Sequence, residues 1–590
     1  MNVIGISGLH NSVAFKKREL PHLSVRQHRI AQGLDSAAAL VTEEGVVAAA
    51  AEERFSREKG TGTFPYHAIQ YCLEAGGLTP SDIDYVAHGF SYEPYRSLFE
   101  NNENEFTKKQ FSEVYSREAQ LRCLRERFPF VEWSSKFFPV PHHLAHAASS
   151  FYLSGFEESL ILIADGMGEV DSTTIAIGYK NHVKVLSRIR ALHSLGILYA
   201  VFTLYLGFDM GTDEYKVMGL APYGNSRRYF EQIMDLVHLQ QNGTYTIAVL
   251  FQNKTLEEKE TYAGTLELLA ERFGPSRAPG AELTQRHMDI AAGLQLVLQA
   301  SLLHILRHFK RETSQKNLCM AGGVALNCTA NAVIKRSRMF KNLFIQPAAG
   351  DDGSALGAAL YVQRTHGACS GPRRMRLPLW GPSFNDSTIR CALDKNRNCG
   401  FTYFHSFDDL VRIVAKRINQ GQIVGWFQGR MEFGPRALGS RSIVADPRDP
   451  GMRDRINALV KKREAFRPFA PAVTIEAASH YFEIEKGDEA TYAYMLFVAQ
   501  VREQYRQQFP SITHVDGSAR VQAVAKQDNA AFWSLLTIFG EISGAPILLN
   551  TSFNVRGQPI VCTPLEAMDT FLLAQLDALA IGNYLIVRTN

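Results

Sequence analysis

Apolar runs separated by glycine-bounded turns predict a β-rich first half that is built from a repeated unit. Residues 3–6 are typical of a buried strand, and residues 33–41 and 46–51 predict a hairpin around an acidic turn that contains glycine. A similar strand at 159–164 ends on an Asp-Gly turn, and a second predicted hairpin begins at 173. The same strand-and-hairpin unit therefore occurs twice along the chain.

This repeat predicts an α/β fold of the duplicated actin, sugar-kinase and Hsp70 type, in which two similar halves bind a nucleotide. Helical periodicity predicts a helix at 66–75, which ends on a glycine pair, and a long amphipathic helix at 289–311. A further short strand is expected at 84–88.

A change in composition marks a domain boundary after the repeat. At 590 residues the chain exceeds the usual size of one hydrophobic core, so more than one domain is expected. Residues 365–380 are rich in glycine, proline and arginine, which is typical of a linker. We therefore predict a first domain at 1–364, a linker at 365–388 and a second domain at 389–590.

Composition excludes several classes of protein. A net charge of +4 does not favour general nucleic-acid binding, and the 8 cysteines include no Cys-x-x-Cys pair, so a structural zinc site is not expected. The most apolar run, at 196–208, is shorter than the roughly 20 residues that a membrane helix needs. The N-terminus reads as a strand rather than a signal peptide. We expect a soluble, cytoplasmic enzyme.

Two histidines and two aspartates form a candidate metal site. His142 and His146 are four residues apart in a predicted helix, so both imidazoles lie on one face. Asp165 and Asp351 each lie in a turn bounded by glycine, where a carboxylate can reach a cleft. Such a set suits a first-row divalent metal, with Fe(II) and Zn(II) as the natural candidates.

The histidine pair has two other interpretations, namely a zinc-protease motif and a structural role in the core. The zinc-protease motif needs glutamate directly after the first histidine, where this chain has His143, so peptide hydrolysis is not expected. The other interpretation is a helix whose two histidines are simply hydrogen-bonded within the core.

Glycine and basic residues predict nucleotide contacts in both domains. Lys216 lies in a glycine-rich loop, and the Gly322-Gly323 turn between a strand and a helix permits close approach of the backbone to an anion. In the second domain, arginine and lysine side chains are interleaved with glycine, as a polyphosphate pocket requires, although the Walker A motif is absent. The alternative is a solvated basic face, but Phe433 and Leu438 beside Arg436 indicate partial burial.

Together these motifs resemble the O-carbamoyltransferases of antibiotic, nodulation-factor and toxin biosynthesis. The resemblance extends over nearly the whole chain, and its most specific string begins at Gly429. The matching stretches are Glu52-Glu-Arg-Phe-Ser-Arg, His142-His-Leu-Ala-His, Tyr215-Lys-Val-Met-Gly-Leu-Ala-Pro-Tyr-Gly, Ala321-Gly-Gly-Val-Ala-Leu-Asn, Ala349-Gly-Asp-Asp-Gly, Gly429-Arg-Met-Glu-Phe-Gly-Pro-Arg-Ala-Leu-Gly, Phe466-Arg-Pro-Phe-Ala-Pro and Asn550-Thr-Ser-Phe-Asn.

The resemblance implies a two-step reaction. A C-terminal YrdC-like α/β domain would use ATP, Mg²⁺ and carbamoyl phosphate to make carbamoyl-adenylate. An N-terminal domain of the duplicated fold, with Fe(II) or another divalent metal, would then transfer the carbamoyl group to a hydroxyl of a small natural product.

By the same resemblance, residues of this chain take family roles. The metal ligands would be His142, His146, Asp165 and Asp351, although Asp352 could replace Asp351. The adenylate would contact Lys216, Gly322, Gly323 and Asn327. ATP and carbamoyl phosphate would bind Arg436, Lys461, Arg467, Arg520, Asn550, Ser552 and Asn554.

The first hairpin departs from the family pattern. The family commonly has His-Asp there, whereas this chain has Leu34-Asp35. His10 is the nearest substitute, and it lies before the inserted residues 13–32. The candidate catalytic residues are therefore Asp35, His10 and Lys59. Residues 13–32 are expected to form a lid or wall of the acceptor pocket, with a solvated loop as the alternative.

Two other functions remain open at this point. The first is a tRNA threonylcarbamoyl-type modification enzyme, which a long basic stripe would favour. The second is an Hsp70-like nucleotide-binding module without catalysis. The sequence does not reveal the acceptor, the metal or the oligomeric state, for which a homodimer is one option.

Overall fold

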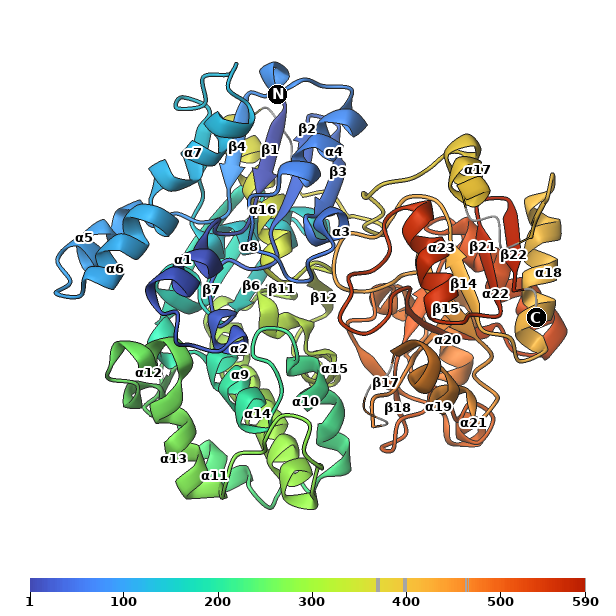
Figure 1. The fold of residues 1–590 in the computed structure, drawn as a ribbon. Coiled ribbons are helices and arrows are strands. Elements are labelled where there is room, and N and C mark those ends of the chain that lie inside the picture. Colours follow the sequence, from blue (N-terminus) through green and yellow to red (C-terminus); the bar gives the residue numbers. More distant parts are fainter. Residues whose placement is uncertain (368–371, 396–399, 462–463, 465, 589–590) are drawn as a thin grey trace. The chain divides into compact units, whose positions relative to one another are not determined.

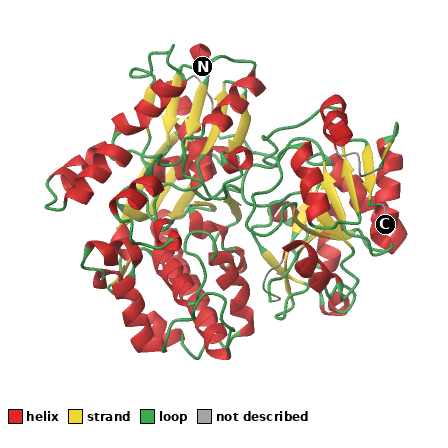
Figure 2. Ribbon diagram, in the orientation of Figure 1, coloured by secondary structure: helices red, strands yellow, loops and turns green. Residues whose placement is uncertain are grey.

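The computed structural model describes residues 1–367, 372–395, 400–461, 464 and 466–588 (Figures 1 and 2). It divides into two compact units. Unit 1 comprises Met1–Glu53 and Gly60–Met375, and unit 2 comprises Arg54–Lys59 and Arg376–Asn590. The main division falls inside the predicted linker. No pattern in the sequence predicted that Arg54–Lys59 belongs with the second half of the chain.

Unit 1 contains two five-stranded sheets with one topology. The sheet orders are β3-β2-β1-β4-β5 and β8-β7-β6-β11-β12. In each sheet the central strand pairs antiparallel with one strand of a hairpin on one side and parallel with a strand on the other, and that strand pairs parallel with the edge strand. The strands are β1 Val3–Ile6, β2 Ala37–Thr42, β3 Gly45–Ala51, β4 Tyr85–His88, β5 Phe137–Pro139, β6 Glu158–Ala164, β7 Asp171–Tyr179, β8 His182–Arg190, β11 Asn317–Ala321 and β12 Asn342–Ile345. The predicted duplicated fold is confirmed.

Two helices pack together between these sheets, α8 His142–Ser154 and α16 Asp351–His366. They approach so closely that a Cβ added at Gly357 would lie 1.8 Å from the Ala145 carbonyl oxygen. A Cβ at Gly5 of β1 would likewise lie 1.9 Å from the Ala355 carbonyl oxygen. Glycine at both positions therefore allows the helix pair to reach the centre of unit 1, where both N-termini carry site residues.

The predicted helices of unit 1 are present. The 66–75 prediction corresponds to α4 Tyr66–Gly76, and the long amphipathic helix is α14 Gln285–Thr313. By length and hydropathy α14 could cross a membrane, but 72% of its most apolar window is buried inside the protein, as in a core helix. The other helices are α1 Ser12–Glu19, α2 Val25–His28, α3 Glu53–Ser56, α5 Arg96–Glu100, α6 Glu105–Gln110, α7 Arg117–Arg127, α9 Leu195–Tyr205, α10 Glu214–Leu220, α11 Phe230–Met234, α12 Leu256–Thr261, α13 Ala263–Phe273 and α15 Cys328–Arg336, beside the short pair β9 Val237–Leu239 and β10 Tyr245–Ile247.

Residues 13–32 form α1 and α2 and pack as part of unit 1. Phe15, Leu20 and Leu23 are buried in one cluster with Phe90 and Phe111. Lys16 is also buried, and its Nζ donates to the carbonyl oxygens of Ile30 and Glu260 at 2.6 and 2.7 Å. The alternative of a solvated loop is therefore wrong, because the segment supplies core side chains.

Unit 2 is built on an eight-stranded mixed sheet in the order β13-β22-β21-β14-β15-β20-β16-β19. Helices α18 Phe407–Asn419 and α22 Ala530–Ser543 pack on it around buried Trp426, Phe532 and Leu548. The strands are β13 Phe401–Tyr403, β14 Val424–Phe427, β15 Arg441–Ala445, β16 Ala470–Thr474, β19 Gln522–Val524, β20 Ile547–Ser552, β21 Ala578–Ile581 and β22 Tyr584–Val587, with β17 Val498–Gln500 and β18 Ser518–Arg520 in a separate pair. The remaining helices are α17 Asp386–Lys395, α19 Met452–Ile456, α20 Ile475–Tyr481, α21 Glu503–Arg506 and α23 Pro564–Leu573. The α/β fold class expected for this part of the chain is confirmed.

Candidate functional site

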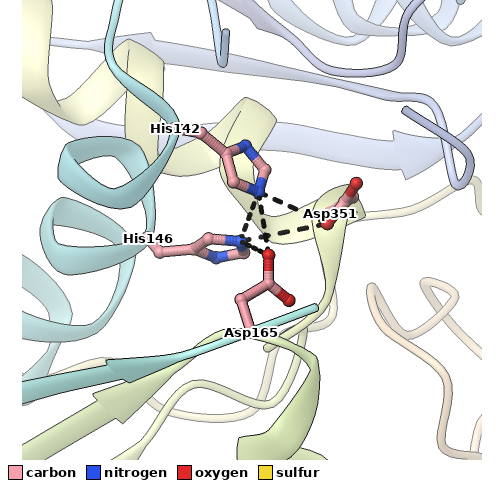
Figure 3. A group of neighbouring side chains, drawn as sticks. All are labelled: His142, His146, Asp165 and Asp351. Carbon is pink, nitrogen blue, oxygen red and sulfur yellow. Dashed lines mark hydrogen bonds and ion pairs between the residues drawn. The ribbon is translucent and has the colours of Figure 1, made fainter. Parts of the chain in front are cut away.

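Four side chains converge at the centre of unit 1 (Figure 3). One ligand atom from each of His142, His146, Asp165 and Asp351 lies within 4.8 Å of the others. The Nε2 atoms of the two histidines are 3.0 Å apart. His142 Nε2 lies 3.3 Å from Asp165 Oδ2 and 3.5 Å from Asp351 Oδ1. The four residues predicted as metal ligands therefore meet at one point.

Local structure explains this convergence. Pro141 precedes α8, so His142 is its first residue and His146 follows one turn later on the same face. Asp165 directly follows β6, and Asp351 is the first residue of α16. The neighbouring Asp352 carboxylate accepts the N–H of Gly353 at 2.9 Å. Asp351, rather than Asp352, is thus the acid that faces the histidines.

Backbone groups and an aromatic ring orient these side chains. His142 Nδ1 lies 2.9 Å from the Gly89 carbonyl oxygen, to which it donates, so Nε2 faces the cluster. The Phe90 ring stacks on the His142 imidazole, with centroids 4.1 Å apart. The N–H of Gly323 donates to Asp165 Oδ1 at 2.9 Å, which leaves Oδ2 directed at His142. Gly89 and Phe90 could not be predicted from the sequence, because each contacts His142 only in the folded protein.

The electrostatics of the cluster fit a bound cation. Burial opposes protonation of His142, but Asp351 and Asp165 outweigh it and raise its pKa well above the ordinary value. Burial and the neighbouring His142 hold the pKa of His146 well below its ordinary value. The two imidazole nitrogens lie 3.0 Å apart beside two carboxylates, so a cation bound there would meet four donor atoms. Two nitrogen and two oxygen ligands match the preference of divalent first-row metals.

The predicted adenylate contacts lie partly beside this cluster. Gly322 has φ 89°, and a Cβ there would lie 2.4 Å from the Ala164 carbonyl oxygen, so only glycine fits this turn. The side chain of Asn327 caps α15 by accepting from Ala330 N and exchanges hydrogen bonds with Gln295. Gln295 was not predicted. Lys216 lies in α10 and forms a buried ion pair with Asp213 at 2.8 Å.

The three candidate catalytic residues have different surroundings. His10 Nδ1 accepts the N–H of Phe64 at 3.0 Å, and burial lowers the pKa of this imidazole. A Cβ added at Gly60 would lie 3.4 Å from Asp35 Oδ1. His10 and Asp35 therefore both adjoin the segment 60–64, whereas Lys59 belongs to unit 2. Their catalytic roles stay predictions.

In unit 2, the motif loop that contains Arg436 is held by a buried carboxylate. Glu432 is 4% exposed, and its Oε1 accepts the N–H groups of Leu438, Ser440 and Arg441 at 2.8, 2.7 and 3.2 Å. Arg441 is fully buried, donates to the carbonyl oxygens of Gln428 and Gly429 and stacks on Phe427. The loop is thereby fixed at both ends.

Two amides hold the middle of the same loop. Asn550 Nδ2 donates to the Ala437 carbonyl oxygen at 3.2 Å and to Gln522 Oε1 at 2.8 Å. Gln522 Nε2 donates to the Leu438 carbonyl oxygen at 2.8 Å. Asn550 was predicted as a ligand-binding residue, but its amide nitrogen is engaged by the loop. Glu432 and Gln522 were not predicted, although both lie close in sequence to predicted residues.

Of the other predicted ligands of unit 2, four lie on or close to strands β20, β18 and β16, namely Ser552, Asn554, Arg520 and Arg467. Ser552 ends β20 and donates to Asn554 Oδ1 at 2.7 Å. Arg520 ends β18, two residues before the start of β19, and the Arg467 guanidinium lies 3.6 Å from the Glu464 carboxylate. Arg436, Arg467 and Arg520 are all partly buried, as expected for Arg436. The side chain of Lys461 lies outside the described part of the structure.

Comparisons with known proteins agree with these two halves. A family model described as carbamoyltransferase N-terminus matches residues 30–360, and one described as carbamoyltransferase C-terminus matches residues 415–588. Nodulation protein NolNO of Sinorhizobium fredii is 39% identical over 100% of this chain and 83% of its own length. Nodulation protein NolO of Bradyrhizobium diazoefficiens is 41% identical over 75% and 78%.

One further relative and one solved structure are also similar to this chain. A protein of Synechocystis, sll1178, is 38% identical over 94% of this chain and 95% of its own length. Among solved structures, the activator of the 2-hydroxyisocaproyl-CoA dehydratase from Clostridium difficile is 13% identical and covers 62% of this chain and 96% of its own, at a TM-score of 0.31, too low to support an argument about this protein. On the family matches, the chain belongs to the carbamoyltransferase family, and the predicted identity as an O-carbamoyltransferase is confirmed.

Proposed function

We propose that unit 2 makes carbamoyl-adenylate and that unit 1 transfers the carbamoyl group to a hydroxyl of a small natural product, such as an antibiotic or a toxin. The observation that carries this proposal is the pairing of two different sites in one chain of this family. One is a cluster of histidine and carboxylate ligands, and the other is an arginine-bearing loop on an α/β sheet.

The first step has a simple balance. One water converts carbamoyl phosphate to carbamate and phosphate. A carbamate oxygen then attacks the α-phosphorus of ATP, and pyrophosphate leaves. Arg436, Arg467 and Arg520 would neutralise the phosphate oxygens, because guanidinium groups donate in a planar fork. Bound Mg²⁺ would share this charge.

In the second step the acceptor hydroxyl oxygen attacks the carbamoyl carbon, and AMP leaves with the electrons of the mixed-anhydride bond. A divalent metal such as Fe(II), held by His142, His146, Asp165 and Asp351, would anchor the adenylate and polarise its carbonyl. The Gly322-Gly323 turn offers backbone approach beside that cluster, and Asn327 and Lys216 would bind the nucleotide. Asp35, with His10 and Lys59, would accept and relay the hydroxyl proton.

Residues 13–32 would form one wall of the acceptor pocket. Gln32 Nε2 donates to the carbonyl oxygens of Met167 and Gly168, two and three residues after Asp165, and Tyr92 donates to Gln32 Oε1. This contact joins the inserted segment to the loop that follows Asp165, and an acceptor that approaches the four candidate metal ligands would then lie beside it. A small acceptor, rather than tRNA, fits the net charge of +4.

Pyrophosphate release from ATP and carbamoyl phosphate tests the first step. We expect Arg436→Ala and Arg467→Ala to slow it by about tenfold or more each, since each removes a charge-assisted contact of roughly 1.5–3 kcal/mol. Arg455→Ala is the matched control, because Arg455 pairs with Asp577 elsewhere in unit 2. Release that does not require carbamoyl phosphate, or is unchanged in both variants, would exclude the proposal.

A further inference from the structure

Six residues from the first tenth of the chain belong to unit 2. The chain leaves unit 1 after Glu53, contributes Arg54–Lys59 to unit 2 and returns at Gly60. The residues on either side of this stretch are joined by a hydrogen bond, in which the N–H of Gly60 donates to Glu53 Oε2 at 2.8 Å. Glu52, 2% exposed, anchors the same point by accepting from His67 and Ala68 at the start of α4. We call Arg54–Lys59 the 54–59 segment.

The first half of the 54–59 segment contacts the loop that carries Arg436. Arg54 is 5% exposed, and its Nη2 donates to the Gly434 carbonyl oxygen at 3.0 Å. Phe55 packs on buried Met431 within the same loop. Gly434 is two residues before Arg436. Arg54 therefore holds the part of the loop before Arg436, whereas Glu432 holds N–H groups after it.

The second half contacts the loop that follows β20. Arg57 Nη1 and Nη2 donate to the carbonyl oxygens of Ile560 and Pro559 at 2.9 and 3.1 Å. Its guanidinium also pairs with Glu566 at the start of α23, at 3.1 Å. This loop begins with Ser552 and Asn554, and it folds back on itself where Val561 N donates to the Phe553 carbonyl oxygen.

One short segment thus connects the two loops that carry predicted ligands of ATP and carbamoyl phosphate. Phe55 packs against a buried cluster that both loops form, with Met431 from one loop and Ile560 and Cys562 from the other. Arg57 has φ 61°, a left-handed conformation that a non-glycine residue adopts only when its surroundings hold it there. The strained backbone of Arg57 and the buried side chain of Arg54 both indicate that the segment is held in one specific conformation.

We propose that Arg54 and Arg57 are positioning residues of the carbamoyl-adenylate site, which they serve by fixing the distance between the Arg436 loop and the Ser552 loop. This inference rests on the proposed function of unit 2. It adds that the first half of the chain supplies part of the adenylate-forming machinery. Neither arginine is assigned a contact with substrate.

The test uses the full-length protein with Arg54→Ala, Arg57→Ala and the conservative Arg54→Lys and Arg57→Lys. Pyrophosphate release gives kcat and the KM values for ATP and carbamoyl phosphate, and thermal unfolding gives stability. We expect the alanine variants to raise the KM for at least one substrate by tenfold or more, and the lysine variants to recover part of the loss. Arg455→Ala is the matched control, because it also loses a carbonyl contact and an ion pair in unit 2, to Gly421 and Asp577.

A KM increase in the Arg54 and Arg57 variants, but not in Arg455→Ala at equal loss of thermal stability, supports the inference. Unchanged KM and kcat in both alanine variants would overturn it. ATP affinity, measured by titration calorimetry on the same proteins, separates this inference from the proposed function. If the unchanged protein releases no pyrophosphate, a loss of ATP affinity in the variants still supports the positioning role, and wild-type affinity still overturns it.

Discussion

The two candidate sites are built in different ways. In unit 1, four side chains converge on one point from the ends of α8, β6 and α16, and the backbone serves only to orient them. In unit 2, side chains instead hold the backbone of the loop around Arg436. Buried Glu432, Gln522 and Asn550 form hydrogen bonds with its N–H and carbonyl groups. The first site is a set of ligands, whereas the second is a supported loop.

This difference predicts how each site fails. Removing one converging ligand leaves the other three without a complete coordination set, so the loss should be nearly total and confined to the metal step. Removing one support of a loop shared by several hydrogen bonds should shift its geometry, and the loss should be graded. The following predictions test that contrast from the largest expected effect to the smallest.

We expect His146→Ala to lose bound metal and carbamoyl transfer while pyrophosphate release continues. Loss of a neighbouring support already costs about 10–100-fold in metal affinity, so loss of a ligand should cost at least as much. Metal content by mass spectrometry and both activities check this, with His304→Ala, outside the cluster, as control. Full metal content and transfer in His146→Ala would refute the metal role of the cluster.

We expect Glu432→Ala to weaken unit 2 and slow pyrophosphate release, with Glu432→Gln between it and the unchanged protein. Alanine leaves three buried N–H groups without their acceptor, at about 1–3 kcal/mol for each stranded group, whereas glutamine keeps one oxygen. Denaturant unfolding measures the cost, and Glu541→Ala, an exposed acid, is the control. If glutamine and alanine behave alike, the loop is not held in the way described.

We expect Gln32→Ala to raise the KM for the acceptor several-fold and to leave pyrophosphate release unchanged. Deleting residues 13–32 would remove the buried side chains Phe15, Leu20 and Leu23, so a single substitution is the sharper experiment. Val25→Ala in the same segment is the control, since Val25 is 74% exposed. Unchanged acceptor kinetics in Gln32→Ala would show that the segment supports the fold without lining the pocket.

The smallest expected effect is a different pH response of stability in the two units. Burial raises the pKa of Glu214 in unit 1 to about 7, above its unfolded value near 4.5. In that window the unfolded state has released a proton that the folded state retains, so stability falls as pH rises from about 4.5 to about 7. The stability of the unchanged protein relative to Glu214→Gln should fall accordingly.

Asp516 in unit 2 should respond in the opposite direction. Burial favours its protonated form, but hydrogen bonds from His514 and Ser518 outweigh this and lower its pKa to about 2. Its contribution to stability is present above about 3.8 and disappears as pH falls towards 2. Thermal unfolding of Glu214→Gln and Asp516→Asn across pH 2–8 checks both signs, and a pH-independent difference for either variant contradicts its prediction.

The amino-acid sequence by itself determined the features that depend on local periodicity. The four-residue spacing placed His142 and His146 on one helical face, and the strand pattern placed Asp165 at the end of β6. The repeated strand-and-hairpin pattern likewise indicated the duplicated fold, because side-chain periodicity is set by the geometry of helices and strands themselves.

Only the tertiary structure decided which groups meet across long stretches of chain. It selected Asp351 over Asp352, engaged Glu432 and Gln522 with the Arg436 loop, and placed Arg54 and Arg57 in unit 2. Except for the ion pairs of Asp351 and Arg57, these contacts are hydrogen bonds to backbone groups, which every residue carries, so nothing in the sequence distinguishes the partner. Burial selects it, because a polar group removed from water must find whichever complementary group the packed fold brings near.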